Sequence, residues 1–351
     1  MAPLVLALKE SAMTDPILIA TGQHGALFDE ALAPFSLTPD HRLDEVFHGL
    51  DPEAMADVIE KALIPVLEPL QLSLALVQGD TTSALAAARA AVACGIPVGH
   101  VEAGLRSHDL QRPWPEEGNR IAIDQLATLL FAPTTDNVAN LEADTKVTGQ
   151  VHVTGNSGID ALLHIHRTSP YPIAKSGRRS VLVTLHRRET IGEPLRRICE
   201  MLRKLADGGE VAVTLPLHPN PHVRSIISNV LSNHPAITLL EPFAYPEMVT
   251  RMAVADLILS DSGGVQEEAP VLGVPLLILR DVTERPEAVA CGSAVLAGTD
   301  PDVIEAHVLR LLGDEAARSA MAAPRFPFGD GNASRKIVAV IENYLRSQNV
   351  T

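Results

Sequence analysis

The apolar positions of this chain fall into short runs, and each run ends in glycine or polar residues before a segment with helical spacing begins. Clear runs lie at residues 72–77, 97–101, 129–132, 151–154, 181–184, 211–215, 237–240 and 257–259. Short apolar runs bounded by turn residues are typical of buried strands. Their alternation with helical segments predicts an α/β fold with parallel, doubly wound sheets.

Amphipathic spacing marks the helices between these strands. We expect helices at residues 49–70, 81–94, 193–206 and 334–345. Asn332 or Ser334 is available as the N-cap of the last one. The chain also begins on a helical pattern at Ala2, which is unusual because α/β domains usually begin with a strand.

The length of 351 residues exceeds one ordinary hydrophobic core and predicts two domains. The polar segment 167–179, which contains two prolines, is the best linker candidate. Two similar α/β domains are expected to hold a cleft between the carboxyl edges of their sheets, where ligands bind.

Composition narrows the class of protein. The net charge of −15 argues against nucleic acid or an anionic membrane as a partner. No apolar run approaches the roughly 20 residues that span a bilayer, and we expect no secretion signal. The three scattered cysteines have no metal-binding or disulfide spacing, which favours a reducing, cytoplasmic location.

A glycine turn follows the run at residues 257–259. Asp261 and Ser262 are placed to cap the helix that follows, while Gly263 and Gly264 let the backbone approach a ligand closely. The N-terminus of a helix after a strand is a ready anion site. Arg285 lies in the polar loop after the next strand, so we favour a bound phosphate over an ordinary capped turn.

Acidic residues follow the strands of the first half. Asp80 and Glu102 stand just past two strand ends, and Glu116 and Glu117 open a helix after a proline-bounded segment. His186 begins an HRRE sequence after the first strand of the second half. Carboxylates beside a histidine allow proton transfer in both directions. The alternative for each is a helix cap or an ion pair, most of all for Glu117.

Other chemistries lack their motifs. No cluster has a recognised metal-ligand spacing, and no GxGxxG sequence follows a strand, so neither a metal nor a nicotinamide cofactor is expected. Acid/base chemistry on a phosphorylated or nucleotide-bearing substrate remains.

Eight segments in order resemble the non-hydrolysing UDP-N-acetylglucosamine 2-epimerases. They are TGQH (21–24), QGDTTSALAAA (78–88), HVEAGLRS (100–107), RPWPEEGNR (112–120), VTGNSGIDAL (153–162), VTLHRRE (183–189), SDSGGVQEEAP (260–270) and RDVTERPEAV (280–289). The resemblance covers nearly the whole chain.

The resemblance implies two Rossmann-like domains in the glycosyltransferase-B arrangement, with a cleft between them. We expect an N-terminal domain at 1–167, a UDP-binding domain at 168–330, and a C-terminal helix at 331–351 that packs back on the first domain. Family members begin with a strand and a loop reading GTRPEAIK, which would precede the segment MAPLVLALKES. That first strand is missing here, so we expect lower stability and poor activity, at ~1–3 kcal/mol per unpaired buried group.

The resemblance also implies the reaction. Family members interconvert UDP-GlcNAc and UDP-ManNAc by eliminating UDP to 2-acetamidoglucal and adding it back, without metal or nicotinamide. They supply precursors of cell-surface polysaccharides, and dimers are usual, so a homodimer is expected.

Motif by motif, the resemblance assigns roles to residues of this chain. The acid/base carboxylates would be Asp80, Glu102 and Glu116, with the catalytic His186 beside the diphosphate. The UDP-binding residues would be Arg187, Ser262, Gly263, Gly264, Glu268 (on the ribose) and Arg285 (on phosphate). An allosteric UDP-GlcNAc would bind near Gln23 and His24. Phe243 and Met248 depart from the family's usual uracil contacts.

Three other functions remain open on the sequence. One is a glycosyltransferase of the same fold, and another is a UDP-sugar binding protein whose activity is impaired by the absent N-terminal loop. The third is a hydrolysing relative that releases free ManNAc. The three carboxylates favour the epimerase, because a transferase needs fewer acids facing the sugar.

Overall fold

A computed structural model describes residues 1–22, 25–43, 50–168, 173, 177–185, 192–217 and 220–348. The chain forms two compact units, the first made of residues 1–161 and 328–351 and the second of residues 162–327. Among the described residues, no helix is long and apolar enough to cross a membrane. The first boundary falls inside α7 (Ser157–Thr168).

The first unit is built on a parallel sheet of four strands in the order β3-β4-β5-β6. These strands are β3 (Ala75–Gln78), β4 (Val98–Val101), β5 (Leu129–Ala132) and β6 (Gln150–Val153). The central strands β4 and β5 are buried along their whole length. Such runs of apolar residues without alternation fit a parallel sheet that is covered on both faces.

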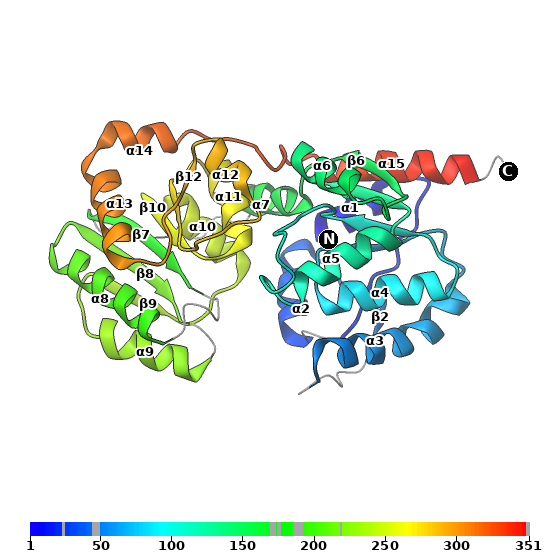
Figure 1. Ribbon diagram of the computed structural model, residues 1–351, viewed down its shortest axis with the longest axis horizontal. Helices are drawn as coiled ribbons and strands as arrows, with labels where there is room; N and C mark the ends of the chain where they lie inside the picture. Colours follow the sequence, from blue (N-terminus) through cyan, green and yellow to red (C-terminus); the bar gives the residue numbers. More distant parts are fainter. Residues whose placement is uncertain are drawn as a thin grey trace. The chain divides into compact units, whose positions relative to one another are not determined.

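Helices cover both faces of this sheet (Figure 1). One face carries α3 (Pro52–Leu67), α4 (Thr82–Ala93) and α5 (Glu116–Leu126). The other carries α1 (Ala2–Glu10) and α15 (Ala333–Gln348), which pack side by side over Val101, Leu129 and Phe131. The two ends of the chain therefore share one core cluster.

Shorter elements complete the first unit. They are α2 (Gly25–Leu32), α6 (Thr135–Ala143), and the separate two-stranded sheet of β1 (Ile19–Ala20) and β2 (His41–Arg42). Strand β1 therefore pairs with β2 and not with the main sheet.

The second unit is a parallel sheet of six strands in the order β12-β11-β10-β7-β8-β9. Its strands are β7 (Arg179–Thr184), β8 (Val211–Pro216), β9 (Ile237–Leu240), β10 (Leu257–Ser260), β11 (Leu276–Ile278) and β12 (Ala294–Leu296). Its helices are α8 (Glu193–Asp207), α9 (Pro221–Leu231), α10 (Tyr245–Val254), α11 (Gly263–Leu272), α12 (Pro286–Ala290), α13 (Pro301–Gly313) and α14 (Glu315–Met321).

This strand order is that of a Rossmann fold. The sheet grows outward in both directions from the neighbouring strands β7 and β10, which makes their carboxyl ends the topological switch point. Ligands of open α/β sheets bind at such a point. The fold class predicted from the sequence, two Rossmann-like α/β domains, is confirmed.

Two predicted helix caps are wrong. The last helix is not capped by Asn332 or Ser334, because the carboxylate of Asp160 in α7 accepts from the backbone N–H groups of Ala333 (3.2 Å) and Ser334 (2.8 Å). Ser262 occupies the N-cap position of α11, but its side chain makes no capping hydrogen bond. Its own N–H donates instead to the Ser260 hydroxyl at 3.0 Å.

Candidate active site

The predicted acid/base residues of the first unit stand at the carboxyl edge of its sheet. Asp80 and Glu102 follow β3 and β4, which pair directly. The Gln78 side chain at the end of β3 donates to Glu102 Oε2 across 3.4 Å, so the two strand ends present their acids next to each other. Glu116 is the first residue of α5, as its position after the prolines predicts.

Arg120 holds Asp80 in place. Its Nε donates to Asp80 Oδ2 at 3.1 Å, and its Nη2 makes a second contact with the same oxygen. The arginine is 3% exposed, while the Asp80 side chain is 26% exposed. A double hydrogen bond from a guanidinium is strong and directional, so it fixes the orientation of the carboxylate.

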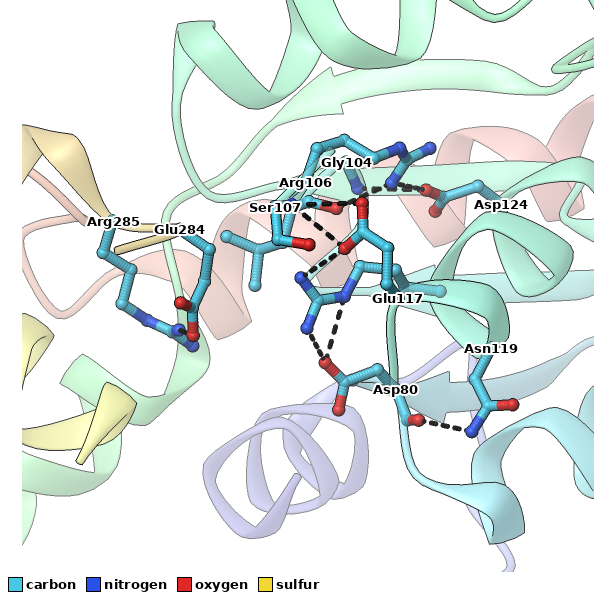
Figure 2. A network of polar contacts seen from close by, with 12 residues as sticks. Asp80, Gly104, Arg106, Ser107, Glu117, Asn119, Asp124, Glu284 and Arg285 are labelled. Atoms are coloured by element: carbon cyan, nitrogen blue, oxygen red, sulfur yellow. Dashed lines mark hydrogen bonds and ion pairs between the residues drawn. The ribbon is translucent and has the colours of Figure 1, made fainter. Parts of the chain in front are cut away.

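Glu117 forms an ion pair and hydrogen bonds within the protein, which is the alternative that the sequence favoured for this residue. Its carboxylate is buried and accepts from the N–H groups of Ser107 (3.0 Å) and His108 (3.0 Å) and from Arg120 Nη1 (3.1 Å) (Figure 2). A carboxylate has about four acceptor positions, and these three donors occupy most of them. Glu117 therefore ties residues 107–108 of the preceding loop to the start of α5. Arg120 contacts both Glu117 and Asp80.

Glu116 differs from its neighbour. Its Oε2 is buried and has no hydrogen-bond partner in the described part of the chain. Buried polar atoms are nearly always hydrogen-bonded, so this oxygen is open to a partner that the described chain does not supply.

Glu102 has a strained backbone. Its φ of 71° lies in the left-handed region, which costs a non-glycine residue roughly 1–2 kcal/mol. The backbone N–H groups of Glu102 and Ala103 both donate to the carbonyl of Phe131 at 3.1 Å, which holds the chain in this conformation. Strain of this kind is typical of functional sites.

The predicted phosphate-binding turn of the second unit lies at the switch point. Residues 261–264 link β10 to the N-terminus of α11, and β10 lies beside β7. The hydroxyls of Thr184 and Ser260 join the ends of the two strands at 2.6 Å. The turn thus presents the positive end of a ten-residue helix at the position where such folds hold phosphate.

Arg285 lies against this turn. A Cβ added to Gly263 would stand 2.8 Å from Arg285 Nη1 and 3.0 Å from its Cζ, so any larger residue here would displace the guanidinium from its position. Two carboxylates orient the group: Nε donates to Glu267 at 2.5 Å and Nη1 to Glu284 at 2.6 Å. Burial alone would raise the pKa of Glu284, but Arg285 and Arg280 outweigh it and lower this pKa to about 2.

Glu268, expected to accept hydroxyls of a ribose, lies on α11 and meets α10. The phenol of Tyr245 donates to its Oε1 at 2.5 Å. Burial raises the pKa of Glu268 to about 7; the Tyr245 hydrogen bond acts in the opposite direction, and the charge of Glu267 adds to the rise. This carboxylate therefore changes charge near neutral pH.

Sequence reasoning missed Arg120 and Tyr245. Arg120 stands four residues after Glu116, on the same face of the helix, and this spacing is the signal that identifies it. Tyr245 carries no such signal, because its contact with Glu268 joins two helices separated by a strand. The predicted residues His186, Arg187, Gln23 and His24 lie outside the described residues.

No three His, Cys, Asp or Glu side chains among the described ranges are grouped so that they would hold a metal ion. The arrangement therefore consists of acids, arginines and a helix N-terminus. Such groups bind an anion and move protons.

Comparison with known proteins decides the family. The family model for UDP-N-acetylglucosamine 2-epimerase matches residues 6–342. This chain belongs to that family. The UDP-N-acetylglucosamine 2-epimerase of Escherichia coli strain K12 is 39% identical over 356 residues, which cover 98% of this chain and 95% of the relative. The chain is therefore an enzyme of an isomerase family.

Solved structures agree with the 2-epimerase assignment. The UDP-GlcNAc 2-epimerase of Neisseria meningitidis, solved with UDP-GlcNAc bound, superposes with a TM-score of 0.91 at 37% identity and covers 98% of this chain and 96% of its own. A glycosyltransferase from Streptomyces nogalater superposes with a TM-score of 0.56 at 17% identity over 97% of this chain and 94% of its own. At that identity the second likeness concerns the fold alone, which is of the glycosyltransferase-B type.

Proposed function

We propose that this chain interconverts UDP-GlcNAc and UDP-ManNAc by eliminating UDP to 2-acetamidoglucal and adding it back, without hydrolysis. The observation that carries the proposal is the family match over residues 6–342, which includes every acid and glycine discussed above. Elimination provides a route because no carbonyl stands next to C2 to make its proton acidic.

The first unit would move the protons. Asp80, oriented by Arg120, and Glu102 border the same sheet edge, while Glu116 has an oxygen, Oε2, that no donor of the described chain occupies. Epimerisation removes the C2 proton from one face and returns it to the other, so it needs more than one acid/base group. Three carboxylates at one sheet edge meet that need.

The second unit would hold UDP while it is detached from the sugar. The turn at Ser262, Gly263 and Gly264 would hold the diphosphate on the N-terminus of α11, with the backbone N–H groups of Gly263 and Gly264 as donors, and Arg285 adds a positive charge at the same turn. Glu268 offers its carboxylate to the ribose hydroxyls. Retention of the detached UDP gives a high effective concentration for its return to C1.

Incubation of the protein with UDP-GlcNAc in heavy water tests this function. We expect deuterium at C2 and the appearance of UDP-ManNAc, followed by NMR. Free ManNAc and UDP would identify a hydrolase. UDP-GlcNAc that binds but keeps its C2 proton would overturn the proposal in favour of a binding protein.

Two variants separate chemistry from binding. Glu116→Gln removes the ionisable oxygen, so C2 exchange should be nearly abolished while UDP still binds. Arg285→Ala removes a charge from the phosphate turn and should weaken UDP binding by about 10-fold or more, the usual loss for a charge-assisted contact. Unchanged exchange in the first variant, or normal affinity in the second, would remove that residue from its role.

We further propose a cytoplasmic homodimer that supplies precursors of cell-surface polysaccharide. The three cysteines are free, and Cys199 is buried with its pKa raised to about 12 by burial, so it stays a thiol. This state suits a reducing compartment. Sedimentation of the protein at micromolar concentration tests the dimer, and a monomer mass would contradict it.

A further inference from the structure

A buried polar cluster lies beneath the acid/base residues of the first unit. It consists of His100 in β4, Asp124 in α5 and Arg106 in the loop after β4. The side chains of His100 and Asp124 are 0% exposed, and that of Arg106 is 7% exposed. None of the three is among the proton-transfer groups proposed above, so their burial requires a different explanation.

Both ring nitrogens of His100 face acceptors. Nδ1 lies 2.6 Å from Asp124 Oδ1, and Nε2 lies 2.9 Å from the carbonyl oxygen of Gly79. The other carboxylate oxygen, Asp124 Oδ2, accepts from Arg106 Nη1 at 2.7 Å and from Gly104 N at 3.3 Å (Figure 2). A carboxylate that receives donors on both oxygens is ionised, and a carbonyl oxygen only accepts.

The ring therefore joins two buried partners, the Gly79 carbonyl and the Asp124 carboxylate, through its two nitrogens. Buried polar contacts of this kind are hard to replace because water cannot supply the lost bond. Arg106 contributes a cation to the same carboxylate.

Each contact of this cluster ends next to an acid/base residue. Gly79 directly precedes Asp80, and Gly104 stands two residues after Glu102 in the strained loop. Asp124 lies on the same helix as Glu116, two turns further along. The three segments that carry the acids are therefore tied to one buried ion pair.

The loop has little freedom elsewhere. A Cβ at Gly104 would stand 2.4 Å from the carbonyl oxygen of Asn137, so the loop packs directly on α6. The Gly104 carbonyl also accepts from Asn140 Nδ2 at 3.0 Å. Asp124 accepts from the N–H of Gly104, and Asn140 donates to the carbonyl of the same residue. A movement of Asp124 would therefore displace the loop that carries Glu102, two residues before Gly104.

We propose that His100 and Asp124 are positioning residues that hold Asp80, Glu102 and Glu116 at the mutual spacing the proton transfers require. The inference rests on the proposed function of the three acids. Misplacement of a reacting group by about 1 Å reduces a rate by about 100-fold, so the cluster controls turnover without contacting substrate.

Two substitutions each keep one of the two histidine bonds. In His100→Asn the amide nitrogen stands near the position of Nδ1 and still faces Asp124. In His100→Gln it stands near the position of Nε2 and still faces the carbonyl of Gly79. His100→Ala removes both bonds. Ile337→Ala, in α15 and buried against the other sheet face, is a control that loses stability through lost packing alone.

The experiment measures C2 deuterium exchange and UDP affinity for each variant at a temperature where circular dichroism shows all of them folded. We expect exchange to fall by about 10- to 100-fold in the Asn and Gln variants and further in the Ala variant, with UDP affinity within about 3-fold of wild type. Ile337→Ala should keep its exchange rate within about 3-fold. Equal losses in Ile337→Ala and the His100 variants would overturn the proposal, as would normal exchange in His100→Ala.

A wild type without C2 exchange would refute the proposed function and with it the positioning role, while active wild type with active His100 variants would refute the positioning role alone.

Discussion

At the scale of single residues, the phosphate turn depends on the absence of one side chain. Arg285 occupies the space that a Cβ of Gly263 would fill, and Glu267 and Glu284 fix the guanidinium from two sides. Gly263 is thus required for a close approach between an arginine and a helix N-terminus. Sequence reasoning assigned this glycine to backbone approach by a ligand, whereas its neighbour in the structure is the arginine.

Gly263→Ala tests this contact. The added methyl group displaces Arg285, so we expect UDP affinity to fall by about 10-fold, equivalent to ~1.4 kcal/mol. Titration calorimetry with UDP measures it. Gly313→Ala, whose Cβ meets nothing within 4 Å, serves as the control and should bind normally. Equal affinities of the two variants would show that Arg285 does not contribute to the nucleotide site.

The pH dependence of substrate affinity should follow Glu268. Its pKa is raised to about 7, chiefly by burial, and hydroxyl donors favour the ionised form. Affinity for UDP-GlcNAc should therefore increase as pH rises from 6, with a midpoint near the pKa of about 7, and level off above about pH 8. Glu268→Gln should bind more weakly and without this pH dependence.

Tyr245→Phe shifts the same profile in a defined direction. Removal of the phenol donor takes away the interaction that lowers the pKa of Glu268, so the midpoint should move to higher pH. Calorimetric titrations at pH 6, 7 and 8 measure both variants. A midpoint that moves to lower pH, or a Glu268→Gln variant that keeps the wild-type profile, would contradict this role for Glu268.

At the scale of elements, α5 organises the acid/base half. Glu116, Arg120 and Asp124 are spaced by four residues and share one face of the helix, while Glu117 faces the loop before it. The helix therefore carries a candidate catalytic acid, the arginine that orients Asp80 and the carboxylate of the buried cluster. A shift of this one element would disturb all three.

Arg120→Met tests the ion pairs of this helix. It leaves the buried Glu117 without its cation, and breaking a buried pair costs about 3–5 kcal/mol of unfolding free energy. Arg196→Met in α8 breaks an exposed pair with Glu193 and should lower the unfolding free energy far less, because water screens exposed charges. Urea unfolding measures both. Similar losses in the two variants would show that the buried network does not contribute more than a surface pair.

Much of the fold could be predicted from the sequence because its signals are local. The apolar runs located β4 and β5, and the proline-bounded acids located the start of α5. The cap of α15 could not be predicted, since Asp160 lies more than 170 positions away in the sequence. The contact between His100 and Asp124 could not be predicted either, because it forms only when β4 and α5 pack together.

At the scale of the whole molecule, the chain divides its tasks between two units. The first unit contains the three carboxylates, and the second contains the glycine turn, Arg285 and Glu268. Substitutions in the first unit should therefore reduce turnover with little effect on UDP affinity, and those in the second should do the reverse. This division follows from where each group lies in its own sheet.

The central claim is that the bond between the sugar and UDP breaks and re-forms during each epimerisation. UDP-GlcNAc labelled with oxygen-18 in that bridging position tests it most directly, with phosphorus-31 NMR to follow the label. We predict that the label spreads into the non-bridging oxygens of the β-phosphate while deuterium from the solvent enters C2. Formation of UDP-ManNAc with the label still confined to the bridge would contradict the mechanism.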